Sequence, residues 1–486
     1  MALLLSGRSG HCSSWACCGS LIHSLALLLF KERPLAWNPG KRLFVQQLLK
    51  LAWPISVQTF IASALTLVDV LMVSQLGQNE LAAVGLINRL YFVILIALVG
   101  FASGAGILAT QFAGRADYQG VGQKLALMAR GARLLTAPLV AVLLFWPYQL
   151  MQWMSSEPEL VALGGEYLQI SAISHLFTAL VFSYATVARG LGESRLPMMI
   201  AVVALLINTL LNALLIFGLG PFPALGVAGA AWSTLMARGI EVLLLITLFY
   251  RRFSSLGLRL VQLWQPVPSW LWRRFSTLAL PFMAQGMLWA VGVFVYNLIY
   301  ASMGAGSLAV MSLLAPVESL MIDLFVGLSA AAAVMIGRSL GQERYQAAKL
   351  RARFVCGQAP LPAALVALLV VIAVFPLLAA TSLSPAALQD ARVVLLMYLL
   401  LLPVKAYTML ISTAVLRAGG DSRGIIVVDN LCLWLVGLPL AWWLANQWQA
   451  PLPAVFCAVI AEELVKSVLF SWRQRQGYWL RSQIKS

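Results

Sequence analysis

Long, nearly uncharged runs of apolar residues dominate the pattern along this chain. Most runs hold at least the ~20 residues that a helix needs to cross a bilayer. Polar and apolar positions do not alternate within them, so helices fit the runs better than barrel strands do. The pattern predicts twelve membrane-spanning helices, over residues 52–75, 81–111, 122–147, 160–188, 196–218, 225–250, 277–301, 308–337, 347–376, 388–416, 424–446 and 453–472.

The pattern also repeats once along the chain. The motif LAxPxxxQ at residues 51–58 recurs 227 residues later, at 278–285. At the same offset Gly114 matches Gly341, and at an offset of 228 the segment RGLGESR (189–195) matches RAGGDSR (417–423). Six is an even number of spans, so both halves enter from the same side and form a parallel repeat about the membrane normal.

The expected fold class is therefore an all-α polytopic membrane protein with 12 transmembrane helices in two pseudo-symmetric six-helix lobes. The short apolar stretch at 21–30 cannot span a bilayer and predicts an interfacial helix, or a start codon assigned too far upstream. The predicted organisation is an N-terminal cytoplasmic extension (1–45), an N-lobe (46–250), a cytoplasmic linker (251–275), a C-lobe (276–473) and a cytoplasmic tail (474–486).

Basic residues gather on one side of the predicted spans. The two termini and the loops after even-numbered spans hold 28 of the 33 Lys and Arg residues, whereas the loops after odd-numbered spans hold only Arg392. The positive-inside rule then places both termini of this multi-pass cell (inner) membrane protein in the cytoplasm. Four arginines at inner helix ends either support the structure or contact headgroups and gate between the lobes: Arg189, Arg195, Arg417 and Arg423.

Composition narrows the class of function. The 486 residues are 61% hydrophobic and 10% charged, with a mean hydropathy of +0.88, whereas a soluble domain carries about 25% charged residues. The net charge of +16 is spread over the inner loops, so lipid headgroups account for it without nucleic acid. The sequence shows no nucleotide-binding loop and no catalytic constellation. We therefore expect no enzyme and no cofactor, and transport driven by an ion gradient.

Several motifs resemble the multidrug and toxic compound extrusion (MATE) transporters, over residues 46–473. They are the first-span pattern Pro54…Asp69…Gly77, the two Arg-rich loops at 189–195 and 417–423, Asn208-x-x-x-Asn212, and GVAGAAWST at 226–234. The resemblance implies two lobes of six helices that export organic cations or other amphipathic compounds against Na⁺ or H⁺. Two such lobes about a normal axis favour rocking between inward-open and outward-open states.

Asp69 is an acid inside an otherwise apolar span. A charged Asp at the bilayer centre costs about 3 kcal/mol, so a function or a buried partner must offset that cost. Asn208 and Asn212 share one face of span 5 because they are four residues apart, and Thr234 in span 6 adds a hydroxyl. These groups form a candidate proton or hard-cation site, and the MATE resemblance places the cation-coupling site at the same positions. Alternatively, Asp69 only pairs with buried donors and the amides only join helices.

The second lobe departs from one branch of the family. The resemblance would place a Glu in span 7 and an Asp in span 10, but the matching residues are Ala290 and Ala406. The repeat equivalent of Asp69 is Tyr296. Coupling is therefore predicted at Asp69, and no metal ion is expected beyond a possible Na⁺ at this residue.

Other polar residues in the spans form a weaker set of substrate-cavity candidates. Glu318 could attract a cationic drug or simply pair with Lys405, and both interpretations stand. Arg238 and Glu241 have the spacing of an intrahelical ion pair. The cavity candidates are Gln58, Gln285, Glu318, Asp323, Lys405 and Tyr407. Four further charges fit either function or structure: Asp429, Glu462, Glu463 and Lys466.

The sequence thus predicts secondary active multidrug efflux by antiport with H⁺ or Na⁺, with H⁺ favoured, through alternating access. The expected partners are a small-molecule drug or toxic compound and the lipid bilayer, with no nucleic acid and no nucleotide, and the protein is expected to be a monomer. The alternatives are a lipid or oligosaccharide flippase on a related fold and an intramembrane transferase. Twelve spans with few buried Lys or Arg residues argue against a flippase, and short outer loops argue against a transferase.

Overall fold

The computed structural model describes residues 39–219, 221–258, 266–378 and 384–484, and their regular structure is helical throughout. The chain divides into two units, Met1–Phe44 and Val45–Ser486, and the account below concerns the second. The predicted interfacial helix at 21–30 and the middle of the predicted linker lie outside the described residues.

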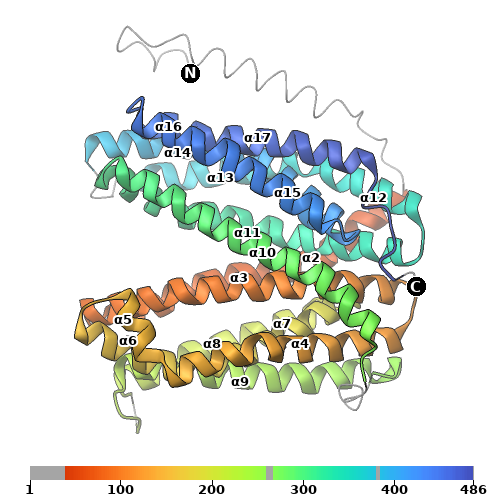
Figure 1. Cartoon of the computed structure of the whole chain (residues 1–486), viewed down its shortest axis with the longest axis horizontal. Coiled ribbons are helices and arrows are strands. Elements are labelled where there is room, and N and C mark those ends of the chain that lie inside the picture. The colour runs from red at the N-terminus through yellow and green to blue at the C-terminus, as the bar shows by residue number, and fades with distance from the viewer. Residues whose placement is uncertain (1–38, 220, 259–265, 379–383, 485–486) are drawn as a thin grey trace. The chain divides into compact units, whose positions relative to one another are not determined.

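The first half of the chain supplies eight helices (Figure 1). They are α2 (Pro39–Ser74), α3 (Gln78–Gly114), α4 (Tyr118–Phe145), α5 (Pro147–Met154), α6 (Pro158–Ser171), α7 (Ser174–Gly190), α8 (Arg195–Phe217) and α9 (Gly226–Phe253).

The second half follows the same plan with two π-helical segments, η5 and η6. Its elements are α10 (Ser269–Ser302), α11 (Ala305–Gly341), α12 (Tyr345–Gln358), α13 (Pro360–Leu377), α14 (Pro385–Met409), η5 (Leu410–Leu416), α15 (Ser422–Cys432), η6 (Leu433–Gly437), α16 (Leu438–Asn446) and α17 (Leu452–Gln476).

The twelve predicted spans all coincide with helices. Among the described residues, 10 helices are long and apolar enough to cross a membrane, and α6 with α7 adds an eleventh span that bends by 45°. The twelfth is α17, whose 25 residues suffice in length but include Glu462, Glu463 and Lys466. The expected fold class is confirmed. The bend at 171–174 and the short helix α5 were not predicted, and helix occupies both ends of the predicted linker, because α9 ends at Phe253 and α10 begins at Ser269.

One aspartate in each half of the chain caps a helix, at positions that the repeat does not match. Asp117 accepts a hydrogen bond from the Gly120 amide at 2.8 Å and caps α4. Asp421 accepts one from the Gly424 amide at 3.3 Å and caps α15. A side-chain oxygen at this position satisfies an amide that would otherwise lack a partner.

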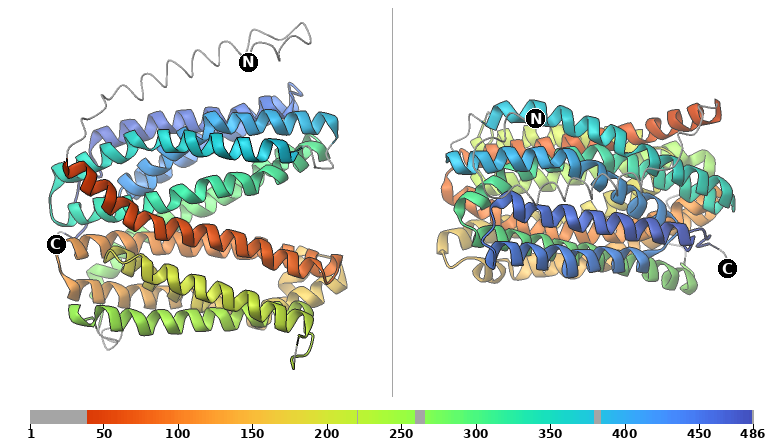
Figure 2. Two further views of the ribbon diagram at one scale, coloured as in Figure 1. Left: turned by 180° about the vertical axis from the view of Figure 1, so that it is seen from behind. Right: turned by 90° about the horizontal axis from the view of Figure 1, so that it is seen from above.

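Two hydrophobic cores form within Val45–Ser486, and α10 crosses between them (Figure 1). Its first half joins the core of α3–α9 through residues such as Phe275, and its second half joins the core of α11–α17 through residues such as Ile299. We call these the first and second bundles. Its repeat equivalent α2 crosses in the opposite sense (Figure 2, left), since Ser56 bonds to α11 and Asp69 to α8.

Hydrogen bonds between the bundles lie toward one end of the helices. Arg338 donates to the carbonyl oxygen of Gly190 at 3.0 and 3.1 Å, and the repeat equivalent of this bond runs from Gln111 to Ala418 at 2.9 Å. The bonds extend inward to Ser63 and Asp323, and we find none between the bundles near α5 among the described residues. In the predicted orientation the connected end faces the cytoplasm.

The matched glycines Gly114 and Gly341 allow this close approach. A Cβ on Gly114 would lie 2.4 Å from the carbonyl oxygen of Arg338, and one on Gly341 would lie 2.1 Å from that of Gln111. Both distances are far inside van der Waals contact, so α3 and α11 can approach this closely only without side chains at these two positions. The repeat match seen in the sequence therefore has a packing reason.

Candidate functional site

The structure places Asp69 against a neutral amide. Asn212 of α8 donates from Nδ2 to Asp69 Oδ1 at 2.7 Å. Asn212 is buried, and its own Oδ1 accepts no hydrogen bond among the described residues. Asp69 is half-buried, and no ion pair to it forms within the described part of the chain. The acid is thus connected to α8 without a cation as its direct partner.

Thr234 reaches this site through a tyrosine that sequence reasoning missed. Thr234 of α9 donates to the carbonyl oxygen of Ala230 at 3.0 Å. Tyr167 of α6, which is buried, shares a hydrogen bond with the Thr234 side chain and interacts electrostatically with Asp69. Four helices therefore supply the site: α2, α6, α8 and α9. Tyr167 carries no spacing signal, because its partners lie on other helices.

Arg238 lies one turn beyond Thr234 and interacts with Asp69 at longer range. Its direct partner is Glu241, whose Oε2 is 2.6 Å from Arg238 Nη1, so the predicted intrahelical pair is confirmed. The arginine lends positive potential to the site while Glu241 holds its guanidinium.

Asn208 stands apart from this set. Its side chain is buried one turn before Asn212, and we find no hydrogen-bond partner for it among the described residues. The structure therefore brings Asp69 and Asn212 into contact, connects Thr234 through Tyr167 and leaves Asn208 outside the contacts. The coupling role of all four stays a prediction.

The two acidic cavity candidates contact different partners in different places. Glu318 pairs with Lys405 and accepts a bond from the Tyr398 hydroxyl at 2.9 Å, so the pairing interpretation describes its geometry. Asp323 accepts a bond from Ser63 of α2 at 2.8 Å, which places it where the bundles meet.

The remaining cavity candidates also do not gather at one place. Gln285 donates to Asp429 Oδ2 at 2.8 Å, and the Tyr407 hydroxyl lies 3.0 Å from Ser471 Oγ. Gln58 is half-buried with no hydrogen bond that we find in the described segments. The six candidates thus occupy several separate contacts, and their role toward substrate stays a prediction.

A buried ionic cluster holds the second bundle together around Lys466 of α17. Lys466 Nζ donates to Glu462 Oε1 at 2.8 Å and to Glu463 Oε1 at 3.0 Å. The Tyr296 hydroxyl donates to the other oxygen of Glu462, and the Thr408 hydroxyl to the other oxygen of Glu463, both at 2.7 Å. Each of the four carboxylate oxygens has a donor. Sequence spacing predicted the pairing within α17 but not the two hydroxyl donors.

No group of three or more His, Cys, Asp and Glu side chains that could hold a metal ion occurs in the described segments. A cation at Asp69 would therefore take its other ligands from amides, hydroxyls, carbonyl oxygens or water. One carboxylate with neutral neighbours is also able to carry a proton.

Comparisons with known proteins agree with this architecture. The MatE family model matches residues 54–214 and 281–443, and the two matches begin at the spacing of the internal repeat. The uncharacterized transporter YisQ of Bacillus subtilis is 25% identical over 454 residues, covering 93% of this chain and 98% of that protein. The probable multidrug resistance protein NorM of Rhizobium meliloti is 31% identical over 284 residues, covering 57% and 59%.

Solved structures share the fold. The Vibrio cholerae MATE transporter VcmN in its bent form has a TM-score of 0.78 at 22% identity, covering 92% of this chain and 99% of that one. At this identity the likeness speaks for the arrangement of helices alone.

Proposed function

Because this chain belongs to the MATE family of membrane transporters, we propose that it exports amphipathic organic cations or similar toxic compounds by antiport with H⁺ or Na⁺. The relatives named as multidrug resistance proteins support drug-like substrates. The family role is transport and not catalysis, and the helices make the chain a multi-pass membrane protein.

The contact of Asp69 with Asn212 is the observation that carries the proposal. An acid that accepts one bond from a neutral amide can take up a proton or a cation without breaking a salt bridge. The carboxylates of Glu462 and Glu463 differ, because a lysine and two hydroxyls already occupy their oxygens. We therefore assign coupling to Asp69. H⁺ is favoured over Na⁺, because one carboxylate beside a neutral amide is enough to carry a proton, whereas a cation would need further oxygen ligands around Asp69.

The position of Asp69 offers a way to couple ion binding to movement. Asn212 ties α2 to α8 at this acid, whereas Ser63 ties the same helix to α11. Uptake of an ion at Asp69 changes its hydrogen bond with Asn212 and so shifts how α2 packs. In the proposed cycle the outward-open protein takes up the ion, its affinity for substrate falls, and the substrate leaves. Such coupling requires that the ion and the substrate bind the two states unequally.

Proteoliposomes loaded with a fluorescent organic cation test this proposal under an imposed H⁺ gradient and then a Na⁺ gradient. We expect one gradient to drive efflux from the wild type, and Asp69→Asn to lower that drive by about tenfold or more. Asp390→Asn is the control, because Asp390 is another half-buried acid, on α14, that has no part in the proposed ion site or substrate cavity, and gradient-driven efflux should persist in this variant.

Two results would count against the proposal. Equal gradient-driven efflux in Asp69→Asn would remove this acid from the mechanism. If thermal melting shows that the protein is folded but neither gradient drives efflux, the flippase alternative is favoured. Translocation of a fluorescent lipid then tests that alternative.

A further inference from the structure

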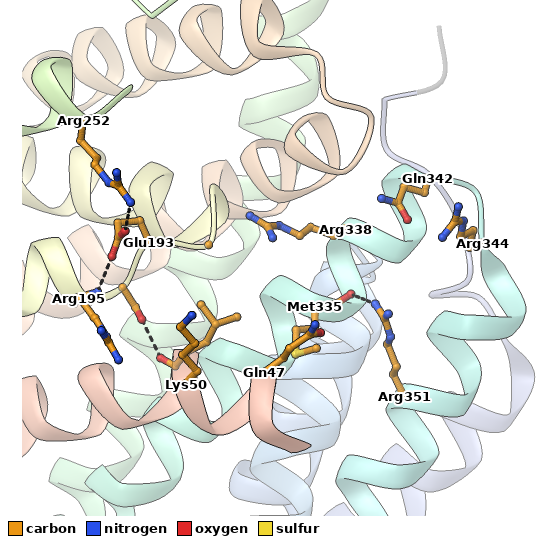
Figure 3. Close-up of a pocket in the computed structure, with 13 residues that line it drawn as sticks. Gln47, Lys50, Glu193, Arg195, Arg252, Met335, Arg338, Gln342, Arg344 and Arg351 are labelled. Carbon is orange, nitrogen blue, oxygen red and sulfur yellow. Dashed lines mark hydrogen bonds and ion pairs between the residues drawn. The ribbon is translucent and has the colours of Figure 1, made fainter. Parts of the chain in front are cut away.

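A basic cavity of about 600 Å³ lies at the end where the two bundles meet (Figure 3). Its walls are the start of α2, the loop between α7 and α8, the ends of α9 and α11, and the start of α12. The basic residues that line it are Lys50, Arg195 and Arg252 from the first half of the chain and Arg338, Arg344 and Arg351 from the second.

The cavity holds far more positive than negative charge. Glu193 is the one acid among its lining residues, and it lies 3.5 Å from Arg252. Arg338 bonds to the carbonyl oxygen of Gly190, and Arg351 to the carbonyl oxygen of Met335 at 3.0 Å, both neutral acceptors. Like charges from the two halves therefore face one another across this space, and their repulsion opposes closure of this end.

Two helix starts add to the positive potential. The residues that lead into α8 and α12, Gly192–Arg195 and Gln342–Arg344, contribute to the cavity wall. The N-cap side chains Ser194 and Arg344 make no capping bond, and on α8 only the Arg195 amide has a side-chain acceptor, Glu193 Oε1 at 3.2 Å. A helix N-terminus carries partial positive charge and free amide donors, which favour phosphate and other anions.

The internal repeat shows what fills the equivalent space on the other side. Gln111 is the repeat equivalent of Arg338, and Arg274 that of Gln47. There Gln111 accepts a bond from the Gln483 amide at 2.7 Å, and Arg274 donates to Gln483 Oε1 at 2.6 Å. The C-terminal tail thus occupies that space, and its Trp479 is buried. No segment among the described residues takes the corresponding place in the basic cavity.

From this contrast we propose that the basic cavity binds a phosphate-bearing anion, which contacts both halves of the chain and holds this end closed. Residues 1–45 carry five bases and one acid, so their charge makes them a poor occupant. The phosphate can come from the headgroup of an anionic phospholipid of the inner leaflet or from a soluble phosphate. Its effect on transport rests on the proposed function, but the binding itself does not.

Thermal melting of the full chain tests the binding. In neutral detergent the melting temperature is followed against inorganic pyrophosphate, and separately against phosphatidylglycerol with phosphatidylcholine as the uncharged reference. We expect a saturable rise with one of the two anions, weakened by added salt. A response to pyrophosphate without lipid identifies a soluble phosphate, and a response to phosphatidylglycerol alone identifies a headgroup.

Substitutions on each side test whether the anion contacts both halves. Lys50→Gln with Arg195→Gln, and separately Arg344→Gln, should each raise the half-saturating concentration by about tenfold, equivalent to 1.4 kcal/mol. Arg423→Gln is the matched control, because Arg423 is the exposed repeat equivalent of Arg195 on the side of the tail. Its half-saturating concentration should stay at the wild-type value.

The proposal fails if neither anion gives a saturable response, or if Arg423→Gln weakens binding as much as the cavity substitutions do. It also fails if only one half of the chain contributes, since the anion would then not bridge. Efflux measured on the same preparations separates the two proposals. Anion binding without efflux would contradict the proposed function and support the anion site. Gradient-driven efflux without anion binding would support the proposed function and contradict the anion site.

Discussion

Asp69 in α2 and Tyr296 in α10 occupy equivalent positions of the repeat, but they face opposite surroundings. Asp69 accepts one bond from the amide of Asn212. Tyr296 donates to Glu462, whose other oxygen already pairs with Lys466. One position thus holds an acid without an ion-pair partner, and the other closes a cluster in which every carboxylate oxygen is engaged.

The basic residue near each position is retained while its partners change. At the repeat offset of 228, Arg238 corresponds to Lys466. Arg238 pairs with Glu241 of its own helix and reaches Asp69 only at longer range. Lys466 is shared by Glu462 and Glu463. Among the described residues, the first half thus holds an acid without an ion-pair partner, while the second half holds two acids that share a buried lysine.

The largest effect that this contrast predicts comes from Lys466→Met. Loss of the ammonium leaves Glu462 and Glu463 buried together without a cation, and breaking a buried pair in this way costs about 3–5 kcal/mol. We expect a correspondingly large fall in the free energy of unfolding, measured by thermal or denaturant melting in detergent. Arg238→Met should cost clearly less, because Arg238 is 37% exposed at its side chain. Equal losses would show that the two halves do not differ in this respect.

A smaller effect is expected from Gly437→Ala in η6. A Cβ there would lie 2.2 Å from Glu462 Oε2 and 2.3 Å from the Tyr296 hydroxyl oxygen, so these two groups must separate. Overpacking of this kind costs about 1–3 kcal/mol. Gly357→Ala is the control, because nothing lies within 4 Å of its added methyl group. Melting curves should show destabilisation by Gly437→Ala and none by Gly357→Ala. Equal curves would mean that Glu462 and Tyr296 move apart at no measurable cost.

Most of the fold could be predicted from sequence, because lipid imposes long apolar helices and charge imposes orientation. The break between α6 and α7 could not, since the apolar run continues through it without a Gly or Pro at the 171–174 bend. The crossing of α2 and α10 between bundles was also missed. This crossing depends on how helices pack against one another, which a hydropathy pattern does not report.

The candidate site divides in the same way. The amide face of α8 was predictable, because helical spacing is local. Contacts between distant segments were not: Tyr167 meets Thr234, and Lys405 meets Glu318, only after the helices have packed. For Glu318 the sequence left two interpretations open, and the structure shows the pairing.

The smallest effect, and the sharpest test of the first half, comes from its two asparagines. Asn212→Leu removes the one amide that bonds to Asp69, which should lower the free energy of unfolding by about 1.5 kcal/mol, as for a hydrogen bond to a charged group. Asn208→Leu replaces a buried side chain for which we find no partner among the described residues, so no hydrogen bond is lost and the free energy of unfolding should not fall. Both replacements keep the side-chain volume nearly constant, which makes each a control for the other in the same melting experiment. If the two variants lose equal stability, Asn208 has a partner of its own, and the ion site at Asp69 extends a full turn further along α8 than the contact with Asn212 indicates.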